Sequence, residues 1–170
     1  MTNAIEPCNL TLTAVTEKDP KHLPELWVEY TKDLEEVTEQ KLASSYFQRY
    51  LKEPKRAALE IDVNGKAVGF ILINEICHFE SNNKNLAEFY IHHGARRKGY
   101  GKLAALTLWE QDPGRWEISV LPKNIRALNF WQQIIRERYG INFLESVEQV
   151  EFDLINPNRW ILQVDSAQHL

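Results

Sequence analysis

The chain has 170 residues, of which 44% are hydrophobic and 26% are charged, and its formal net charge is −4. This length is enough for one domain with a buried core, and the mildly acidic charge argues against a nucleic-acid-binding protein. No apolar run approaches the roughly 20 residues that span a bilayer, and residues 1–6 lack the basic and apolar regions of a signal peptide. We therefore expect a single cytoplasmic domain, residues 1–170. We expect neither a nucleic acid nor a membrane as its partner.

The N-terminal third predicts one strand and two helices. Alternation of β-prone residues indicates a strand over 10–15. A helix is expected to begin near His22 or Leu23, because Pro24 is tolerated only in the first turn of a helix. Its buried stripe is formed by apolar residues at helical spacing: Leu26, Trp27, Tyr30, Leu34 and Val37. A second, short helix is predicted around residues 46–51 and ends before Pro54.

The middle of the chain predicts a hairpin followed by a strand and a helix. Asn64-Gly65 is typical of a type I′ turn, and it separates strands that are expected over 57–63 and 67–73. A further strand, 86–91, leads through a glycine loop into a helix that includes 103–109. Asp112-Pro113-Gly114 is expected to end that helix.

The C-terminal third predicts a strand over 116–120 and a helix that begins after an Asn124 cap and runs to about Arg138. Two closing strands are expected over 147–154 and 160–164. The element order is therefore β-α-α-β-β-β-α-β-α-β-β, which favours a mixed α/β sheet with helices on both faces.

The segment Arg96-Arg97-Lys98-Gly99-Tyr100-Gly101-Lys102 stands where the 86–91 strand is followed by a helix. Glycine there allows positive φ and lets backbone N–H groups approach a ligand closely. The free N–H groups and positive dipole end of the new helix favour an anion, typically a phosphate, and four cationic side chains strengthen that preference. This segment therefore predicts a site for a phosphate-bearing ligand.

Arg96-x-x-Gly99-x-Gly101 resembles the acyl-CoA-binding loop of the GNAT superfamily of N-acetyltransferases. Ile91 stands where that family has Val or Ile at the end of its fourth strand. The segment from Asn124 through Ala127 and Phe130 to Trp131 is similar to the second motif of the family, Asn-x-x-Ala-x-x-Phe-Tyr. Val68-Gly69-Phe70 in the hairpin is also similar to the family pattern, so the resemblance covers residues 57–131.

The resemblance implies a GNAT-like fold: a mixed, mostly antiparallel sheet of six to seven strands, with helices on both faces and a V-shaped splay between the central parallel strands. It also implies acetyl-CoA (coenzyme A) as co-substrate and no metal. The pyrophosphate would rest on the N–H groups from Arg97 to Lys102, and the pantetheine arm would pair with the strand near Ile91. Asn124 would bond that arm, Ala127 would leave room for it and Phe130 would pack nearby. The implied cofactor-binding residues are Ile91, His92, His93, Arg96, Arg97, Lys98, Gly99, Tyr100, Gly101, Lys102, Asn124, Ala127, Phe130 and Trp131.

The activity implied by the resemblance is N-acetyl transfer to a primary amine, small molecule or peptide, by direct attack. An alkyl ammonium has a pKa near 10.4, so a base is useful at neutral pH. Glu88, on the strand that leads to the loop, is the candidate base; the alternative is a structural ion pair. Glu117 is a second candidate, or a residue that faces solvent. Ser119 faces the same way as Glu117 by alternation, and we expect it to position a water or the substrate.

Trp131 departs from the family pattern, which often has a tyrosine there to protonate the leaving thiolate. An indole N–H cannot act as that acid at neutral pH. Either the thiolate leaves with little help, or another group such as Tyr90 or Tyr139 serves, or transfer is slow or lost. Packing on a helix is the simplest role for Trp131. The alternative function is therefore a non-catalytic acyl-CoA-binding sensor or interaction module on the same fold.

Several further residues allow two interpretations. His92 and His93 are adjacent on an extended segment and point to opposite faces, so they form a poor metal pair. The acidic run at Asp33, Glu35, Glu36 and Glu39 is either a solvated helix face or a surface that attracts a cationic amine. Tyr46, Phe47 and Tyr50 either pack in the core or line the acceptor site.

The two cysteines, Cys8 and Cys77, have neither zinc nor C-x-x-C spacing. We expect them to be buried, reduced thiols, which fits a cytoplasmic protein. The closing strands can complete the sheet within one chain or pair between two, so both a monomer and a homodimer are compatible with the sequence.

Overall fold

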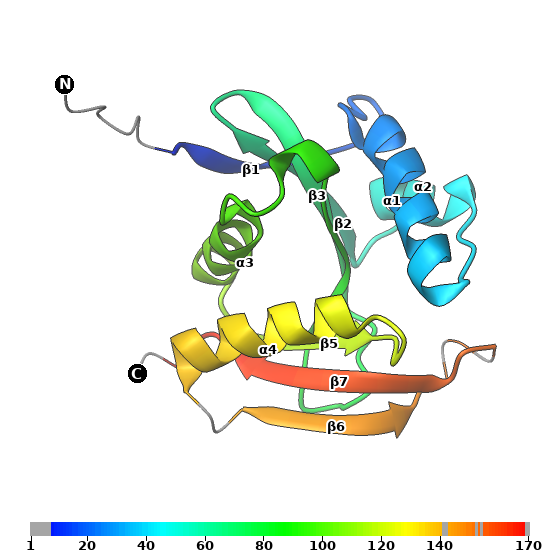
Figure 1. The fold of residues 1–170 in the computed structure, drawn as a ribbon, viewed down its shortest axis with the longest axis vertical. Helices are drawn as coiled ribbons and strands as arrows, with labels where there is room; N and C mark the ends of the chain where they lie inside the picture. The colour runs from blue at the N-terminus through cyan, green and yellow to red at the C-terminus, as the bar shows by residue number, and fades with distance from the viewer. Residues whose placement is uncertain (1–7, 141–142, 152, 154, 169–170) are drawn as a thin grey trace.

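The computed structural model describes residues 8–140, 143–151, 153 and 155–168. Its elements follow the predicted order, with one addition, the short 3₁₀ helix η1 after the fourth strand (Figure 1). Their bounds are β1 Leu10–Val15, α1 Leu23–Thr38, α2 Ser44–Lys52, β2 Arg56–Val63, β3 Lys66–Asn74, β4 Lys84–Ile91, η1 His93–Ala95, α3 Tyr100–Gln111, β5 Arg115–Val120, α4 Ile125–Tyr139, β6 Leu144–Gln149 and β7 Asn158–Asp165.

The strands form one seven-stranded sheet in the order β1-β2-β3-β4-β5-β7-β6. All neighbouring strands are antiparallel except β4 and β5, which are parallel because α3 carries the chain between them. The sheet is therefore mixed and mostly antiparallel, as the resemblance implied.

Helices cover both faces of the sheet (Figure 1). On one face, α1 and α2 pack on the sheet through an aromatic cluster that includes Trp27, Tyr30, Phe47 and Phe70. On the other face, α3 and α4 cover a larger core in which Trp109, Trp116 and Trp131 are buried. The predicted two-sided burial is thus confirmed, and the site lies where the two central strands separate between these layers.

The splay between β4 and β5 follows from their register. The two strands pair only over Lys84–Leu86 and Trp116–Ile118, although β4 continues to Ile91 and β5 to Val120. On its other edge β4 shifts register against β3, because Leu72 pairs with Glu88 whereas Ile73 pairs with Leu86, which leaves Ala87 as an extra residue. A bulge of this kind bends its strand, and it stands at the point where pairing with β5 ends.

Two local predictions at turns and caps are confirmed. Asn64 and Gly65 have φ values of 51° and 78°, the pair of positive values that a type I′ turn requires. Asn124 caps α4, since its side chain accepts a hydrogen bond of 3.2 Å from the backbone N–H of Ala127.

Three expectations were wrong. Val37 belongs to the predicted stripe of α1 but is 43% exposed, whereas Leu34 and Thr38 in the same turn are buried. Cys8 is exposed and Cys77 half-buried; both are free thiols, as expected, but neither is buried. The strand predicted over 147–154 instead covers Leu144–Gln149.

The displaced strand has a local cause. Asp153 accepts hydrogen bonds from the backbone N–H groups of Ile155 and Asn156 and pairs with Arg159, so this stretch forms the turn between β6 and β7. Residues 152 and 154 of the predicted strand lie outside the described residues. In the part of the chain that the structure describes, the helices are too short or too polar to cross a bilayer.

Candidate active site

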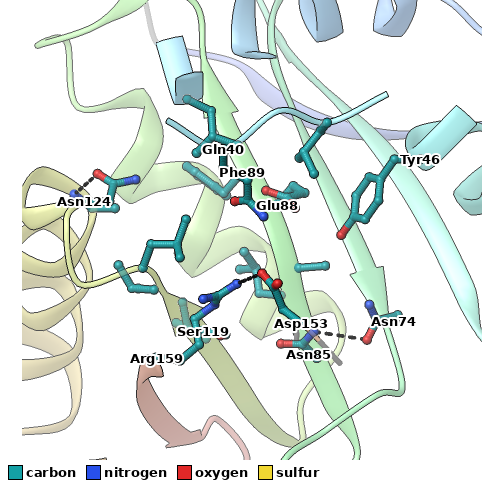
Figure 2. Close-up of a pocket in the computed structure, with 18 of the residues that line it drawn as sticks. Gln40, Tyr46, Asn74, Asn85, Glu88, Phe89, Ser119, Asn124, Asp153 and Arg159 are labelled. Atoms are coloured by element: carbon teal, nitrogen blue, oxygen red, sulfur yellow. Dashed lines mark hydrogen bonds and ion pairs between the residues drawn. The ribbon is translucent and has the colours of Figure 1, made fainter. Parts of the chain in front are cut away.

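A cavity of about 550 Å³ opens in the splay between β4 and β5 (Figure 2). Its walls include residues of the bulged part of β4, the end of β5, the start of α4, α1 and α2, and single residues of β2, β3 and β7. One part of the cavity lies in the gap between the strands, where an extended ligand arm would fit. The other part, called the chamber below, lies under α1 and α2, and its lining residues include Tyr30, Tyr46, Arg56, Asn74 and Glu88.

Glu88 lies on β4 in the wall of this chamber (Figure 2). The Tyr30 hydroxyl, from α1, donates a hydrogen bond to its carboxylate. Burial raises the pKa of Glu88 to about 7, although the hydrogen bonds from tyrosine hydroxyls and the Arg159 charge act in the opposite direction. A carboxylate with such a pKa is half-ionised near neutral pH, which is the range in which a general base works well.

A chain of neutral polar groups lies beside Glu88. The hydroxyls of Tyr46 and Tyr50 are 3.3 Å apart, and the Asn74 amide donates to the Tyr50 oxygen at 2.9 Å. Asn85 in turn donates to the Asn74 oxygen at 3.1 Å. These groups link α2 to β3 and β4, and they make this part of the wall polar without adding charge.

Ser119 and Glu117 on β5 have different surroundings. The Ser119 hydroxyl oxygen is buried in the wall of the cavity and has no hydrogen-bond partner among the described residues. Glu117 is 2% exposed and accepts hydrogen bonds from the backbone N–H groups of His78 and Phe79 and from the Asn82 amide. Glu117 therefore anchors the loop between β3 and β4, which removes it as a second candidate base and also excludes the solvent-facing alternative.

The predicted phosphate loop offers unused backbone donors. Between Arg97 and Lys102, no backbone N–H group donates a hydrogen bond to another described residue. Arg97 and Gly99 have positive φ values of 61° and 81°, and α3 begins at Tyr100, directly after them. A concave turn of free N–H groups at a helix N-terminus is an anion-binding arrangement.

The cationic side chains of this loop divide into two pairs. Arg96 turns back from the loop: its Nε donates to the Ile91 carbonyl at 2.7 Å, and a terminal nitrogen lies 2.5 Å from the Asp33 carboxylate on α1. Lys102 forms an ion pair with Glu137. Arg97 and Lys98 are exposed and form no ion pair with the described residues, so they are the two side chains that remain for an anionic ligand.

The loop has glycine at positions 99 and 101 for two different structural reasons. Position 99 favours glycine because its φ is positive, although the space beside it is open. At Gly101, a Cβ would come within 3.0 Å of the Phe130 ring, so this glycine allows α3 to pack closely on α4. Phe130 thus contacts the loop from the second motif, which brings the two predicted motifs together.

The second motif also supplies one wall of the gap between the strands. Asn124, Ala127 and Trp131 line the cavity, and Ala127 is small enough to leave its width open. Trp131 is 4% exposed and packs edge-on against Phe89 and Phe130, so its packing role is confirmed. The Asn124 carboxamide oxygen is used by the helix cap, which leaves its N–H₂ group for a ligand.

The remaining candidates lie outside the cavity. Tyr90 packs under Arg96, with its hydroxyl 3.4 Å from Glu29, and Tyr139 packs on Trp109; neither lines the cavity, so neither is placed to protonate a leaving group there. His92 lies 3.6 Å from Glu29, and His93 lies 3.0 Å from Asp33. The two histidines thus join the loop to α1 and stand beside the predicted phosphate site.

The acidic run of α1 does not reach the cavity either. Asp33 pairs with Arg96 and His93, Glu35 with Lys41, and Glu39 with Lys123. Burial raises the pKa of Asp33, but its bonds to Arg96 and His93 outweigh burial and hold that pKa below its usual value. The solvated or ion-paired interpretation of this run is therefore supported over the substrate-attracting one.

Sequence reasoning missed much of the chamber wall. Helical spacing predicts Tyr30 only as part of an apolar stripe, and no local pattern indicates that its hydroxyl bonds Glu88, 58 positions away. The polar wall residues that no motif indicated include Arg49, Arg56, Asn74, Asn85, Asp153 and Arg159. They come from five separate elements and a loop, and their convergence has no signal in local spacing.

These features together fit an extended, phosphate-bearing thioester. The free N–H groups after Arg96 suit its phosphates, and the unpaired edge of β4 beyond Leu86 can bond an amide-containing arm. The cavity then continues from that edge to Glu88. No group of histidine, cysteine, aspartate and glutamate side chains within the described ranges is arranged to bind a metal.

Comparisons with solved structures agree with this fold. A crystal structure of an acetyltransferase from Thermus thermophilus superposes with a TM-score of 0.69 at 18% identity, covering 92% of this chain and 96% of that one. Diaminobutyrate acetyltransferase EctA from Paenibacillus lautus, in complex with its substrate L-2,4-diaminobutyric acid and coenzyme A, superposes with a TM-score of 0.64 at 12% identity, covering 96% and 99%. A chimera of the spermidine N-acetyltransferase SpeG from Vibrio cholerae and hSSAT has a TM-score of 0.59 at 11% identity, covering 93% and 96%.

At these identities the structural neighbours establish the fold, and no curated protein sequence matches the chain. The sequence model of the Acetyltransferase (GNAT) family, however, matches residues 23–134, which is most of the chain and includes both motifs, Glu88 and Tyr30. The chain therefore belongs to the GNAT acetyltransferase family.

Proposed function

We propose that this protein transfers the acetyl group of acetyl-CoA to a primary amine by direct attack. The observation that carries the proposal is the position of Glu88, a carboxylate with a pKa of about 7, in a cavity continuous with the gap between β4 and β5. Family membership supports acetyl transfer, and the geometry of the chamber supports an acceptor that is deprotonated there.

Acetyl-CoA supplies an activated acetyl group as a thioester. The backbone N–H groups from Arg97 to Lys102, with the exposed side chains of Arg97 and Lys98, would bind its phosphates. The free edge of β4 between Ala87 and Ile91 would hold the pantetheine arm, with the Asn124 amide group on its other side. Ala127, Phe130 and Trp131 would shape the apolar wall beside that arm.

Glu88 makes the acceptor nucleophilic. At pH 7 only about one in 2,500 alkylamine molecules is neutral, which corresponds to a penalty of about 4.6 kcal/mol. Glu88 takes one proton from the ammonium, directly or through a water, and the nitrogen lone pair then attacks the carbonyl carbon of the thioester. The C–S bond breaks, and the second proton leaves nitrogen to solvent as the amide forms. Ser119, whose hydroxyl has no partner within the described chain, would orient that water or the acceptor.

The leaving thiolate needs no protein acid in this scheme. Trp131 occupies the position expected for one, and the tyrosines suggested as substitutes lie outside the cavity. Because a thiol has a pKa near 8.5, its thiolate is a moderate leaving group that takes a proton from solvent after release.

Two measurements test the proposal. Calorimetry with acetyl-CoA should show saturable binding, and a thiol-release assay with a panel of primary amines should show turnover above the rate of hydrolysis. Absence of binding at millimolar acetyl-CoA would refute the cofactor assignment. Tight binding without thiol release for any amine would favour the non-catalytic sensor instead.

A further inference from the structure

Two arginines stand at the end of the acceptor chamber that is formed by α2 and β2. Arg49 and Arg56 both line the cavity, and both donate through Nε to the same carboxylate, that of Glu53, at 2.8 and 2.7 Å. Two guanidinium groups thus share one carboxylate, so this end of the chamber has one positive charge in excess.

Arg56 is the better placed of the two to bind a ligand. Its side chain is only 10% exposed, whereas that of Arg49 is 52% exposed, and its guanidinium lies 4.9 Å from the centre of the Tyr50 ring. Nε is the only nitrogen of this guanidinium that bonds within the described residues, so both terminal nitrogens remain available. Glu53 fixes the guanidinium at Nε, the Tyr50 ring lies against its face, and its two terminal nitrogens are free. A guanidinium in this arrangement is suited to bind a carboxylate in a bidentate manner.

The sheet register places Arg56 on the same face as Glu88. Glu88 pairs with Leu72, and Arg56 pairs with Asn74, two residues further along the same strand. Residues opposite each other and residues two apart share a face of the sheet. Two strand spacings and two residue steps put the Cα atoms of Glu88 and Arg56 roughly 12 Å apart.

The other charges near the chamber do not change this polarity. Arg159, the third arginine in the wall, is 2.6 Å from Asp153 and is neutralised by it. The acidic residues of α1 do not line the cavity, and Asp33 pairs with Arg96 and His93. The chamber therefore has a carboxylate at the β4 end, an excess cation at the α2–β2 end, and neutral hydroxyl and amide groups between them.

We propose that the acceptor is a primary amine that carries a carboxylate on the same molecule, with Arg56 binding the carboxylate while the amine lies at Glu88. A zwitterion of this kind matches both ends of the chamber, whereas a simple alkylamine or a polyamine leaves the Arg56 donors unpaired. The inference rests on the proposed acetyl transfer for the placement of the amine, but the carboxylate contact is a separate property of the chamber.

The test compares acids with their matched amides. The acceptors are β-alanine, γ-aminobutyrate, δ-aminovalerate and ε-aminocaproate, each with its primary amide, and kcat/KM is compared per concentration of neutral amine. Because a hydrogen bond to a charged group is involved, we expect at least one acid to exceed its amide by about tenfold to a hundredfold. The chain length with the largest ratio reports the distance between the two ends of the chamber.

Variants of Arg56 test whether this side chain causes the preference for acids over amides. In Arg56→Gln the ratio of acid to amide should fall close to one, because the acid loses more than the amide does, and Arg56→Lys should keep part of the preference. Arg115→Gln, at an exposed position on β5 that is not in the cavity wall, is the control for loss of one positive charge. Acetyl-CoA calorimetry on each variant confirms that the fold and the cofactor site are intact.

The outcomes separate this inference from the proposed function. Equal kcat/KM for acids and amides, or a preference that survives in Arg56→Gln, overturns the inference and leaves acetyl transfer standing. If no amine is acetylated although acetyl-CoA binds, the proposed function fails, and binding of the same acids to protein saturated with coenzyme A still decides the inference. Binding that Arg56→Gln abolishes supports it, and absence of binding by any acid refutes it.

Discussion

The Tyr30 hydroxyl donates a hydrogen bond to the Glu88 carboxylate, joining α1 to β4 across 58 positions of the sequence. Burial raises the pKa of Glu88, and the Tyr30 bond lowers it because a hydrogen bond from a donor stabilises the ionised carboxylate. The balance leaves the pKa at about 7, so the protein has a base that is available near neutral pH.

Replacing Glu88 with glutamine should lower kcat by about a hundredfold or more, because a positioned general base contributes that much to a proton-transfer step. Affinity for acetyl-CoA should stay near the wild-type value, since Glu88 lies in the chamber and not at the phosphate loop. Steady-state thiol release and calorimetry measure the two quantities. Wild-type turnover in a folded Glu88→Gln protein would show that Glu88 is not the base.

The pH dependence of kcat/KM should contain a rising limb near pH 7, because the ionised form of Glu88 is the active one. Tyr30→Phe removes the hydrogen bond that lowers the pKa of Glu88, so the limb should move to higher pH. Tyr139→Phe, which alters a hydroxyl outside the cavity, is the control and should leave the limb in place. An unchanged profile in Tyr30→Phe would mean that another group titrates.

Glu88 should also make the folded protein less stable at high pH. Its pKa is about 7 in the folded state against 4.5 for an ordinary glutamate, so the unfolded chain releases this proton first as the pH rises. Stability from this group is therefore complete below pH 4.5 and is lost between about pH 4.5 and 7. Glu88→Gln should raise the unfolding free energy by about 1–3 kcal/mol at pH 8 and by little at pH 4. Denaturant unfolding at both pH values measures this difference.

Gly99 provides a direct test of the phosphate loop. Its φ is 81°, a conformation that asparagine and aspartate tolerate better than other residues with side chains. Gly99→Asp should weaken acetyl-CoA binding about tenfold relative to Gly99→Asn, since the two differ by one negative charge beside the phosphates. Calorimetry on both variants, at low and high salt, provides the comparison. Equal affinities would place the phosphates elsewhere. Gly101 is a poorer choice, because any side chain there meets the Phe130 ring.

Local signals in the sequence were sufficient for most of the fold. Asn64-Gly65, Pro24 and Asn124 each act through backbone conformation or a nearby hydrogen bond, and each lies in the predicted element. The predicted bounds of β6 were wrong, because Asp153 forms a turn that depends on Arg159 as well as on its own neighbours. Neither role predicted for Glu117, a base or a solvent-facing residue, is the one found, because its partners lie 35 to 39 positions away in the β3–β4 loop.

The sequence by itself determined the element order, the two motifs and the family resemblance, because strand alternation, glycine positions and caps are encoded within a few residues. Only the tertiary structure decided what the site contains. The bulge at Ala87 turns Glu88 under α1, and sheet register brings Arg56 onto the face of Glu88. Packing also turns Arg96 away from the phosphate loop to Asp33. Contacts of this kind depend on how distant segments pair and pack, and local spacing does not encode that pairing.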